Sequence, residues 1–306
     1  MSGVENISDD GAAVVRPPEW ESALVLRARR PELRPICGGT DLMVDINFGR
    51  SRPAGLLDLS GIAELATWEL IDDGTVVRLG AALPYQRIAT ELATACPALA
   101  MAARTVGSPQ IRSRGTVGGN LATASPAGDA HPPLLASRAG VEVASVRGRR
   151  VIGIDDFFVG PKRSALAPDE LIRAVLVPVA AGPQHFAKVG PRNAMVIATV
   201  SFALAVDTAA GRVGTGIGSA GPTPLRAPEA ERMLEGALAA RWATPGPPDD
   251  DVLTEFGRAV AAAASPIDDV RGTADYRRHA LGVLARRCAG WAWAELAAGA
   301  PPGAMA

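Results

Sequence analysis

The amino-acid sequence predicts an α+β protein with two domains, and three observations lead to this expectation. Two glycine segments, at residues 36–42 and 114–121, are interleaved with short strand and helix patterns. A bend rich in proline and glycine follows at residues 178–183. Beyond this bend strand patterns come first and alanine-rich helix patterns later, as in an α+β domain. A chain of 306 residues is long enough to form two domains.

The bend sets the expected domain boundaries. We expect a disordered N-terminal tail over residues 1–13 and a first domain over residues 14–180, with subdomains of about 14–70 and 71–180. The second domain is expected over residues 184–300.

Composition excludes several classes of function. A formal net charge of −1 and an aromatic content of 4% favour neither a nucleic-acid partner nor an anionic membrane. No apolar run reaches the roughly 18 residues of a membrane span, and the polar, acidic residues 1–11 do not resemble a signal peptide. The three scattered cysteines are typical of reduced thiols, so we expect a cytoplasmic protein.

The same counts limit the redox chemistry. Three cysteines cannot supply the four closely spaced ligands of an iron–sulfur cluster, and a zinc site built from three histidines is improbable. We expect no metal site in this chain. Redox chemistry would therefore need a bound organic cofactor.

The first elements form a small βαβ-like unit. A helix is expected at residues 20–29, a strand at 33–36, a helix at 41–46 and a strand at 55–59. Asp41 is the expected N-cap of the second helix. Because a strand–glycine–helix order directs helix N–H groups at a ligand, this unit predicts a phosphate contact.

The remaining elements follow from hydrophobic periodicity and turn residues. The second glycine segment is expected to be a loop. Around it we expect strands at residues 76–81, 141–146 and 171–177, and helices at 85–95, 97–105 and 132–139. The second domain is expected to have strands at 186–189, 197–206 and 213–217, then helices at 228–240, 252–264 and 276–298, with a loop at 244–251.

The two glycine segments together predict a diphosphate cradle. Glycine allows close approach and positive φ, so successive N–H groups can converge on phosphate oxygens. Either segment alone is more often a simple turn. No G-x-G-x-x-G pattern is present, which argues against a Rossmann site.

Three motifs carry a family resemblance. CGGTDL at 37–42, RGTVGGNLATASPAGD at 114–129 and DDVRGTADYRR at 268–278 resemble the FAD-binding medium subunit of molybdenum hydroxylases, the group of xanthine dehydrogenase and aerobic carbon monoxide dehydrogenase. The resemblance covers about residues 14–290. It implies a two-subdomain FAD-binding fold of the PCMH (vanillyl-alcohol oxidase-like) type, then an α+β C-terminal domain of the CO dehydrogenase flavoprotein type. FAD would lie between the glycine segments.

The resemblance also implies a set of FAD-contacting residues, and no catalytic residue. They are Ile36, Cys37, Gly38, Gly39, Thr40, Asp41, Leu42, Val106, Thr116, Val117, Gly118, Gly119, Asn120, Asp129, Leu171, Ile172 and Lys188.

Some of these residues have alternative interpretations. Asp129 would hold polar groups of FAD or cap a helix. Lys188 would stabilise negative charge at the pyrimidine edge of the flavin, or extend its ammonium to solvent. Cys37 is expected to be a small buried filler. Outside the set, His131 is a surface histidine or a proton shuttle beside the flavin. The motif at 271–278 is expected to be structural.

The resemblance implies a function within a complex. Such a subunit accepts electrons from the [2Fe–2S] clusters of a small subunit and passes them through FAD to an external acceptor. A large subunit with the molybdenum cofactor completes a heterotrimer that can dimerise. Two alternatives stay open: a free-standing FAD-dependent oxidoreductase acting on a small substrate, and a scaffold that has lost its cofactor.

Overall fold

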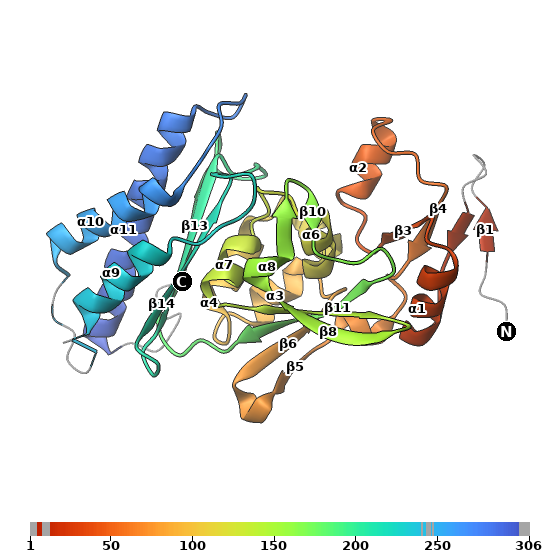
Figure 1. Cartoon of the computed structure of the whole chain (residues 1–306), viewed down its shortest axis with the longest axis horizontal. Helices are drawn as coiled ribbons and strands as arrows, with labels where there is room; N and C mark the ends of the chain where they lie inside the picture. The colour runs from red at the N-terminus through yellow and green to blue at the C-terminus, as the bar shows by residue number, and fades with distance from the viewer. Residues whose placement is uncertain (1–4, 8–12, 240, 243–245, 247, 300–306) are drawn as a thin grey trace.

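The computed structural model describes residues 5–7, 13–239, 241–242, 246 and 248–299. Its elements form an elongated molecule in which an N-terminal sheet, a central sheet and a C-terminal sheet follow one another (Figure 1). No helix in these described ranges is long and apolar enough to cross a membrane.

The N-terminal sheet has the strand order β1-β2-β4-β3. Its strands are β1 (Glu5–Ile7), β2 (Ala13–Val15), β3 (Leu33–Ile36) and β4 (Gly55–Asp58), with helices α1 (Trp20–Arg29) and α2 (Leu42–Asn47) between them. Both β2 and β3 run parallel to β4. Contrary to the expected disordered tail, Glu5–Ile7 pairs with Ala13–Val15; residues 1–4 and 8–12 of that tail lie outside the described residues.

The central sheet is antiparallel, in the order β5-β6-β11-β7-β8. Its strands are β5 (Trp68–Ile71), β6 (Val76–Gly80), β7 (Gly140–Ser145), β8 (Gly148–Gly153) and β11 (Leu171–Pro178). The other elements are α3 (Tyr85–Glu91), α4 (Pro97–Thr105), α5 (Pro109–Arg114), α6 (Val117–Thr123), α7 (His131–Ala136), α8 (Ile154–Phe157) and the short pair β9 (Phe158–Gly160) and β10 (Arg163–Ser164).

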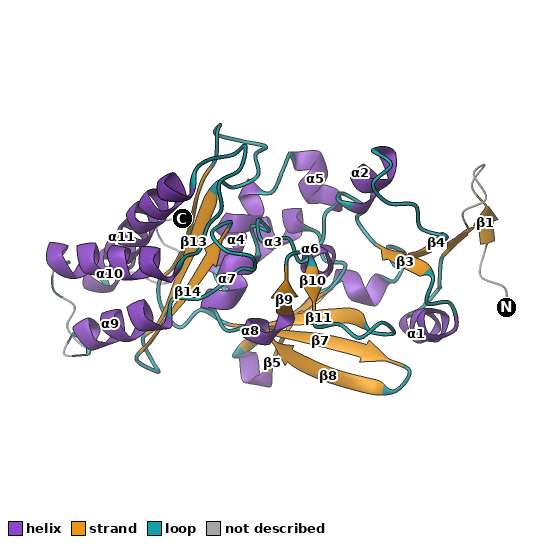
Figure 2. Cartoon of the chain, turned by 45° about the horizontal axis from the view of Figure 1, so that its top comes forward, coloured by secondary structure: helices purple, strands orange, loops and turns teal. Residues whose placement is uncertain are grey.

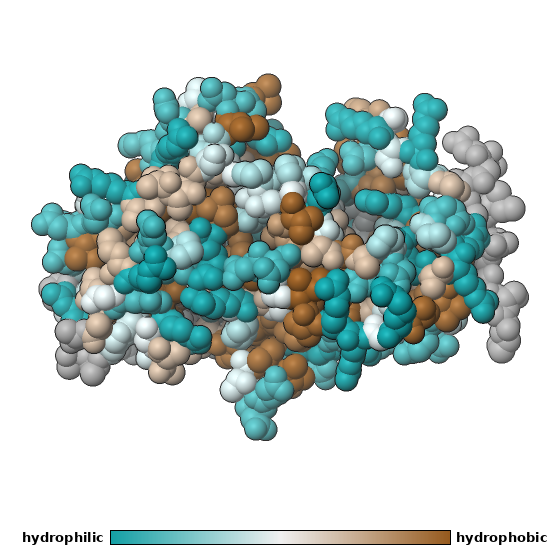
Figure 3. Space-filling model, viewed as in Figure 1, coloured by the Kyte–Doolittle hydropathy of each residue, from teal (hydrophilic) through white to brown (hydrophobic). Residues whose placement is uncertain are grey.

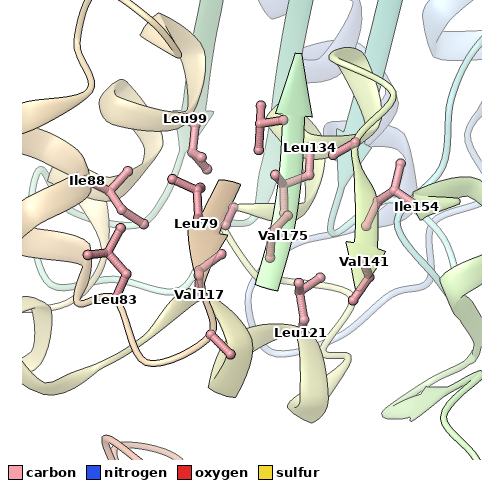
Figure 4. Close-up of a cluster of buried hydrophobic side chains, with 14 of the residues drawn as sticks. Leu79, Leu83, Ile88, Leu99, Val117, Leu121, Leu134, Val141, Ile154 and Val175 are labelled. Atoms are coloured by element: carbon pink, nitrogen blue, oxygen red, sulfur yellow. The ribbon is translucent and has the colours of Figure 1, made fainter. Parts of the chain in front are cut away.

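A hydrophobic core joins this sheet to its helices. Leu79 and Val175 of the sheet lie beside Val117 and Leu121 of α6, and Figure 4 shows them in one cluster. All four side chains are fully buried. The second glycine segment is therefore anchored through its own apolar residues.

The C-terminal sheet is a meander of three antiparallel strands, β12 (Gln184–Val189), β13 (Val200–Asp207) and β14 (Arg212–Gly218). Helices α9 (Pro228–Leu238), α10 (Asp250–Ala263) and α11 (Ala274–Ala298) cover one face, while α4 and α7 of the central part contact the other (Figure 2). A Cβ at Gly216 of β14 would lie 1.9 Å from the Pro132 carbonyl oxygen, so this contact requires glycine.

Several expected elements differ in the structure. The second glycine segment is helical from Val117, because the Thr116 side chain accepts the Gly119 N–H at 3.1 Å and caps the helix. The strand expected at 197–206 begins at Val200, and β5, β8, α5 and α8 were not expected. Two consecutive glycines have low helix propensity, so tertiary contacts decide this helix. Ala240 and part of the loop expected at 244–251 lie outside the described residues.

Candidate functional site

A cavity of about 580 Å³ lies where the two glycine segments meet. Its other walls come from residues 162–172 beside the central sheet and from residues 195–197 of the C-terminal part. The space-filling view is notched along its upper edge between the lobe that carries α2 and the C-terminal part (Figure 3). A volume in this range is typical of a small-molecule or cofactor site.

The first glycine segment packs directly against the start of the second. A Cβ at Gly38 would lie 2.0 Å from the Arg114 carbonyl oxygen, and Gly39 has a φ of +72°. The Met43 N–H donates to Gly39 O at 3.0 Å, so the N–H groups of Thr40 and Asp41 precede the first bond of the α2 turn. Free N–H groups at the start of a helix are the kind of donor that a phosphate binds.

The Asp41 carboxylate does not cap α2, contrary to the sequence prediction. It makes no side-chain capping bond, and its Oδ2 instead accepts the Thr123 hydroxyl at 3.3 Å. Since Thr123 ends α6, this bond joins the first glycine segment to the helix that contains most of the second, and both residues line the cavity.

The backbone of the second glycine segment is already hydrogen-bonded within the chain. The Gly118 N–H donates to Ala81 O at 3.0 Å, Gly119 donates to the Thr116 side chain, and the Asn120 N–H donates to Thr116 O at 3.0 Å. In this conformation these N–H groups therefore have acceptors within the chain, and their contact with a diphosphate stays a prediction. Gly119 is exposed and lines the cavity, so the absence of a side chain there leaves volume open in the cavity.

Asp129 and Lys188 form a buried ion pair at 2.7 Å, with side chains 9% and 10% exposed. The Lys188 ammonium also donates to the carbonyl oxygens of Thr105 at 3.0 Å and Val196 at 3.2 Å. Lys188 therefore does not extend to solvent, and it lies behind Asp129 without lining the cavity. Burial raises the pKa of Asp129, while the nearby Lys188 charge opposes that rise.

His131 is fully buried, so its interpretation as a surface residue is wrong. Its ring lies 4.6 Å from that of Phe158 and fills the space beside Gly128, where a Cβ would be 2.3 Å from its Cε1. Burial lowers the pKa of His131 to about 4, so the ring is neutral at neutral pH. His131 is not among the residues that line the cavity.

Fifteen of the seventeen predicted site residues line this one cavity. Val117 belongs to the core and Lys188 lies behind Asp129. Cys37 is half-buried and lines the cavity, and desolvation raises the pKa of its thiol. Neither Asp129 nor any other side chain caps α7, so the N-cap alternative for Asp129 is wrong. The fifteen are Ile36, Cys37, Gly38, Gly39, Thr40, Asp41, Leu42, Val106, Thr116, Gly118, Gly119, Asn120, Asp129, Leu171 and Ile172.

Sequence reasoning missed other lining residues. They include Arg27, Arg34 and Tyr85, then Lys162, Ser164 and Leu166 to Pro168, and Met195 to Ile197. Arg34 and Tyr85 lie inside expected secondary structure, where a single polar side chain gives no signal. The two loops reach the cavity only through tertiary folding.

Unpaired polar atoms show what the cavity can hold. Within the described part of the chain, Arg27 Nε, Tyr85 Oη, Asn120 Oδ1 and Asp129 Oδ1 are buried without a hydrogen-bond partner, and all four residues line the cavity. Buried polar groups are normally satisfied, so these atoms indicate a polar ligand. Two donors and two acceptors, beside free helix N–H groups, fit a long cofactor with a diphosphate and hydroxyl groups.

Comparisons with known families agree with this site. Residues 8–180 match the FAD binding domain in molybdopterin dehydrogenase, and residues 185–292 match the CO dehydrogenase flavoprotein C-terminal domain.

Individual relatives span nearly the whole chain. The chain is 33% identical to the nicotine 6-hydroxylase medium subunit of Paenarthrobacter nicotinovorans, over 89% of this chain and 93% of that protein. It is 29% identical to a putative xanthine dehydrogenase FAD-binding subunit of Escherichia coli, over 91% and 94%. It superposes on a chain of the reconstituted CO dehydrogenase from Oligotropha carboxidovorans with a TM-score of 0.83 and 28% identity, covering 91% and 96%.

These likenesses confirm the predicted α+β FAD-binding fold and the C-terminal domain of the CO dehydrogenase flavoprotein type. The relatives are subunits of multi-subunit oxidoreductases. The chain therefore belongs to the FAD-binding medium subunits of the molybdenum hydroxylase family, and FAD is its cofactor.

Proposed function

We propose that this chain works as the electron-transfer subunit of a heterotrimer, which can dimerise. It accepts electrons from the [2Fe–2S] clusters of a small subunit and passes them through FAD to an external acceptor, while a large subunit with the molybdenum cofactor oxidises the substrate. Bound FAD supplies the exchange between one-electron and two-electron transfer. The names of the relatives, as medium subunits of hydroxylases and dehydrogenases, support this assembly.

The observation that carries the proposal is the cavity between the two glycine segments, with its unpaired buried polar atoms. We propose that the fifteen predicted residues that line it contact FAD. Thr40 and Asp41 would donate N–H groups to the diphosphate, Gly119 would leave room for it, and Asn120 and Asp129 would hold polar groups of the cofactor. Lys188 would act through Asp129, whose orientation and charge it fixes at 2.7 Å.

We also propose the expected domain boundaries, residues 14–180 and 184–300, because the core of the central sheet and the core under α9–α11 are separate clusters. A cytoplasmic location is part of the proposal. The three cysteines, Cys37, Cys96 and Cys288, are all free thiols, as is usual in a reducing compartment.

The free-standing oxidoreductase has less support. It requires an acid or base positioned beside the flavin, and His131 was the candidate for this role. Its burial behind Gly128 and its lowered pKa remove it from that position.

The test is purification of the chain from its native host with whatever co-elutes, followed by its visible spectrum. Flavin bands with an iron–sulfur shoulder and two further subunits are the expected result. Flavin bands on a lone chain of 31.4 kDa would favour the free-standing enzyme, and a colourless folded chain would contradict FAD binding.

A matched pair of variants assigns the site in the same preparation. Gly119→Val fills space at the cavity wall, and we expect FAD affinity to fall about 10- to 100-fold with the fold intact. Gly236→Val is the control, because nothing lies within 4 Å of a Cβ at Gly236. Equal flavin content in both variants would remove Gly119 from the site.

A further inference from the structure

Tyr85 has a hydroxyl group that the fold leaves unpaired. Tyr85 is the first residue of α3, and its side chain is 2% exposed. Its Oη has no hydrogen-bond partner in the described ranges, yet the residue lines the cavity. A folded protein normally satisfies a buried hydroxyl, because leaving it unpaired destabilises the fold.

The position of Tyr85 is fixed by the second glycine segment. The Tyr85 N–H donates to Gly115 O at 3.0 Å, and its ring is 3.7 Å from where a Cβ of Gly115 would lie. The backbone bond holds the start of α3 against the second glycine segment, and the ring packs beside Gly115 at the cavity.

The electrostatic surroundings make this hydroxyl a permanent donor. Burial, with smaller contributions from the carboxylates of Asp129 and Asp41, raises the pKa of Tyr85 well above its ordinary value. Both carboxylates belong to residues that line the same cavity. The phenol therefore stays protonated, and it needs an acceptor.

We propose that Tyr85 is a further FAD-binding residue, whose hydroxyl donates a hydrogen bond to an acceptor atom of the bound cofactor. This inference rests on the proposed function of the cavity. It adds a side-chain donor from α3 to the two glycine segments, and it gives the buried hydroxyl an acceptor.

The test compares the full-length chain with two variants, after flavin removal. Tyr85→Phe keeps the ring and deletes only the hydroxyl. Tyr276→Phe is the matched control, because Tyr276 is the other tyrosine of the chain, is 49% exposed and does not line the cavity. FAD is titrated into each protein with flavin fluorescence as the signal, and the melting temperature of each flavin-free protein is measured.

Tyr85→Phe should weaken FAD binding without lowering the stability of the flavin-free protein. For Tyr85→Phe we expect the Kd for FAD to rise about 5- to 10-fold, which corresponds to about 1.0–1.4 kcal/mol. The flavin-free melting temperature should stay equal or rise, because an unsatisfied group is gone. Tyr276→Phe should change neither quantity.

An unchanged Kd for Tyr85→Phe would overturn the proposal. A lower flavin-free melting temperature with an unchanged Kd would assign the hydroxyl a structural role instead. If the wild-type chain itself fails to bind FAD, the proposed function of the cavity fails, and this outcome is distinct from equal binding by wild type and variant.

Discussion

Individual glycines and one histidine show how single residues shape this site. Gly38 is required by the Arg114 carbonyl 2.0 Å from its absent Cβ, whereas Gly119 meets only the Thr116 hydroxyl, at 3.0 Å. The first is therefore a packing residue and the second leaves room for a ligand. His131 supports the cavity from behind, since its ring occupies the volume that a side chain at Gly128 would need.

His131 should make stability depend on pH. Its folded-state pKa of about 4 lies below the ordinary 6.5, so between these values the unfolded chain binds a proton that the folded chain does not. Stability that is present above pH 6.5 should be lost as the pH falls toward 4, by roughly 3 kcal/mol for this group. The free energy of unfolding, measured with urea at several pH values across this range, should therefore fall steeply as the pH is lowered.

His131→Leu should make that profile shallower, although His185, with a pKa also lowered to about 4, keeps part of the slope. His279→Gln, at an exposed position, is the control and should leave the profile unchanged. If the free energy of unfolding of His131→Leu fell with pH as steeply as that of the wild type, His131 would not be the group responsible.

At the scale of elements, the Asp129–Lys188 pair joins three parts of the structure. Lys188 lies on β12, Thr105 ends α4, and Asp129 precedes α7. The ammonium contacts all of these elements, since it donates to Asp129 and to the Thr105 carbonyl. The pair therefore fixes the C-terminal sheet to the wall of the cavity.

Replacing one partner of the Asp129–Lys188 pair should lower the free energy of unfolding more than replacing both. We expect Lys188→Met to lower the free energy of unfolding by about 3–5 kcal/mol, because a buried carboxylate is left unpaired. The double variant Lys188→Met, Asp129→Asn should recover part of this loss, as measured by urea unfolding. Arg258→Met, which breaks a pair 74% and 58% exposed, should change little. Strictly additive losses at Lys188 and Asp129 would show that the pair is not coupled.

At the scale of the whole molecule, the C-terminal domain forms part of the support for the site. Gly214 and Gly216 allow β14 to approach α7 so closely that a Cβ at either would lie 1.9 Å from a carbonyl oxygen. Next to this contact, the Ser219 N–H donates to Pro126 O at 2.9 Å, within the segment that leads to Asp129. The two domains therefore share the wall behind the cavity.

Enlarging this contact should weaken the domain interface. Gly216→Ala is expected to lower the free energy of unfolding by about 1–3 kcal/mol, because the Pro132 carbonyl must move to admit the methyl group. Differential scanning calorimetry measures the change. Gly236→Ala is the control, since its Cβ would meet open space on α9. Equal melting temperatures for the two variants would mean that the contact between β14 and α7 can admit a methyl group without strain.

The sequence predicted more of the fold than of the contacts within it. The helix expected at residues 20–29 and the strand expected at 33–36 match α1 and β3, because local pattern and tertiary environment agree there. The β8 strand, rich in arginine and mostly exposed, has no such pattern. The helix at Val117 was missed because capping by Thr116 and burial against Leu79 outweigh the low propensity of two glycines.

The sequence by itself determined the family, the cofactor and fifteen residues that line the cavity, because its glycine motifs are local and specific. Only the tertiary structure decided which of these residues have free hydrogen-bonding groups. Whether the Gly118 N–H is bonded depends on Ala81, and whether Lys188 reaches a ligand depends on Asp129 and Thr105. The partners are 37, 59 and 83 residues apart in the chain, so no local pattern specifies them.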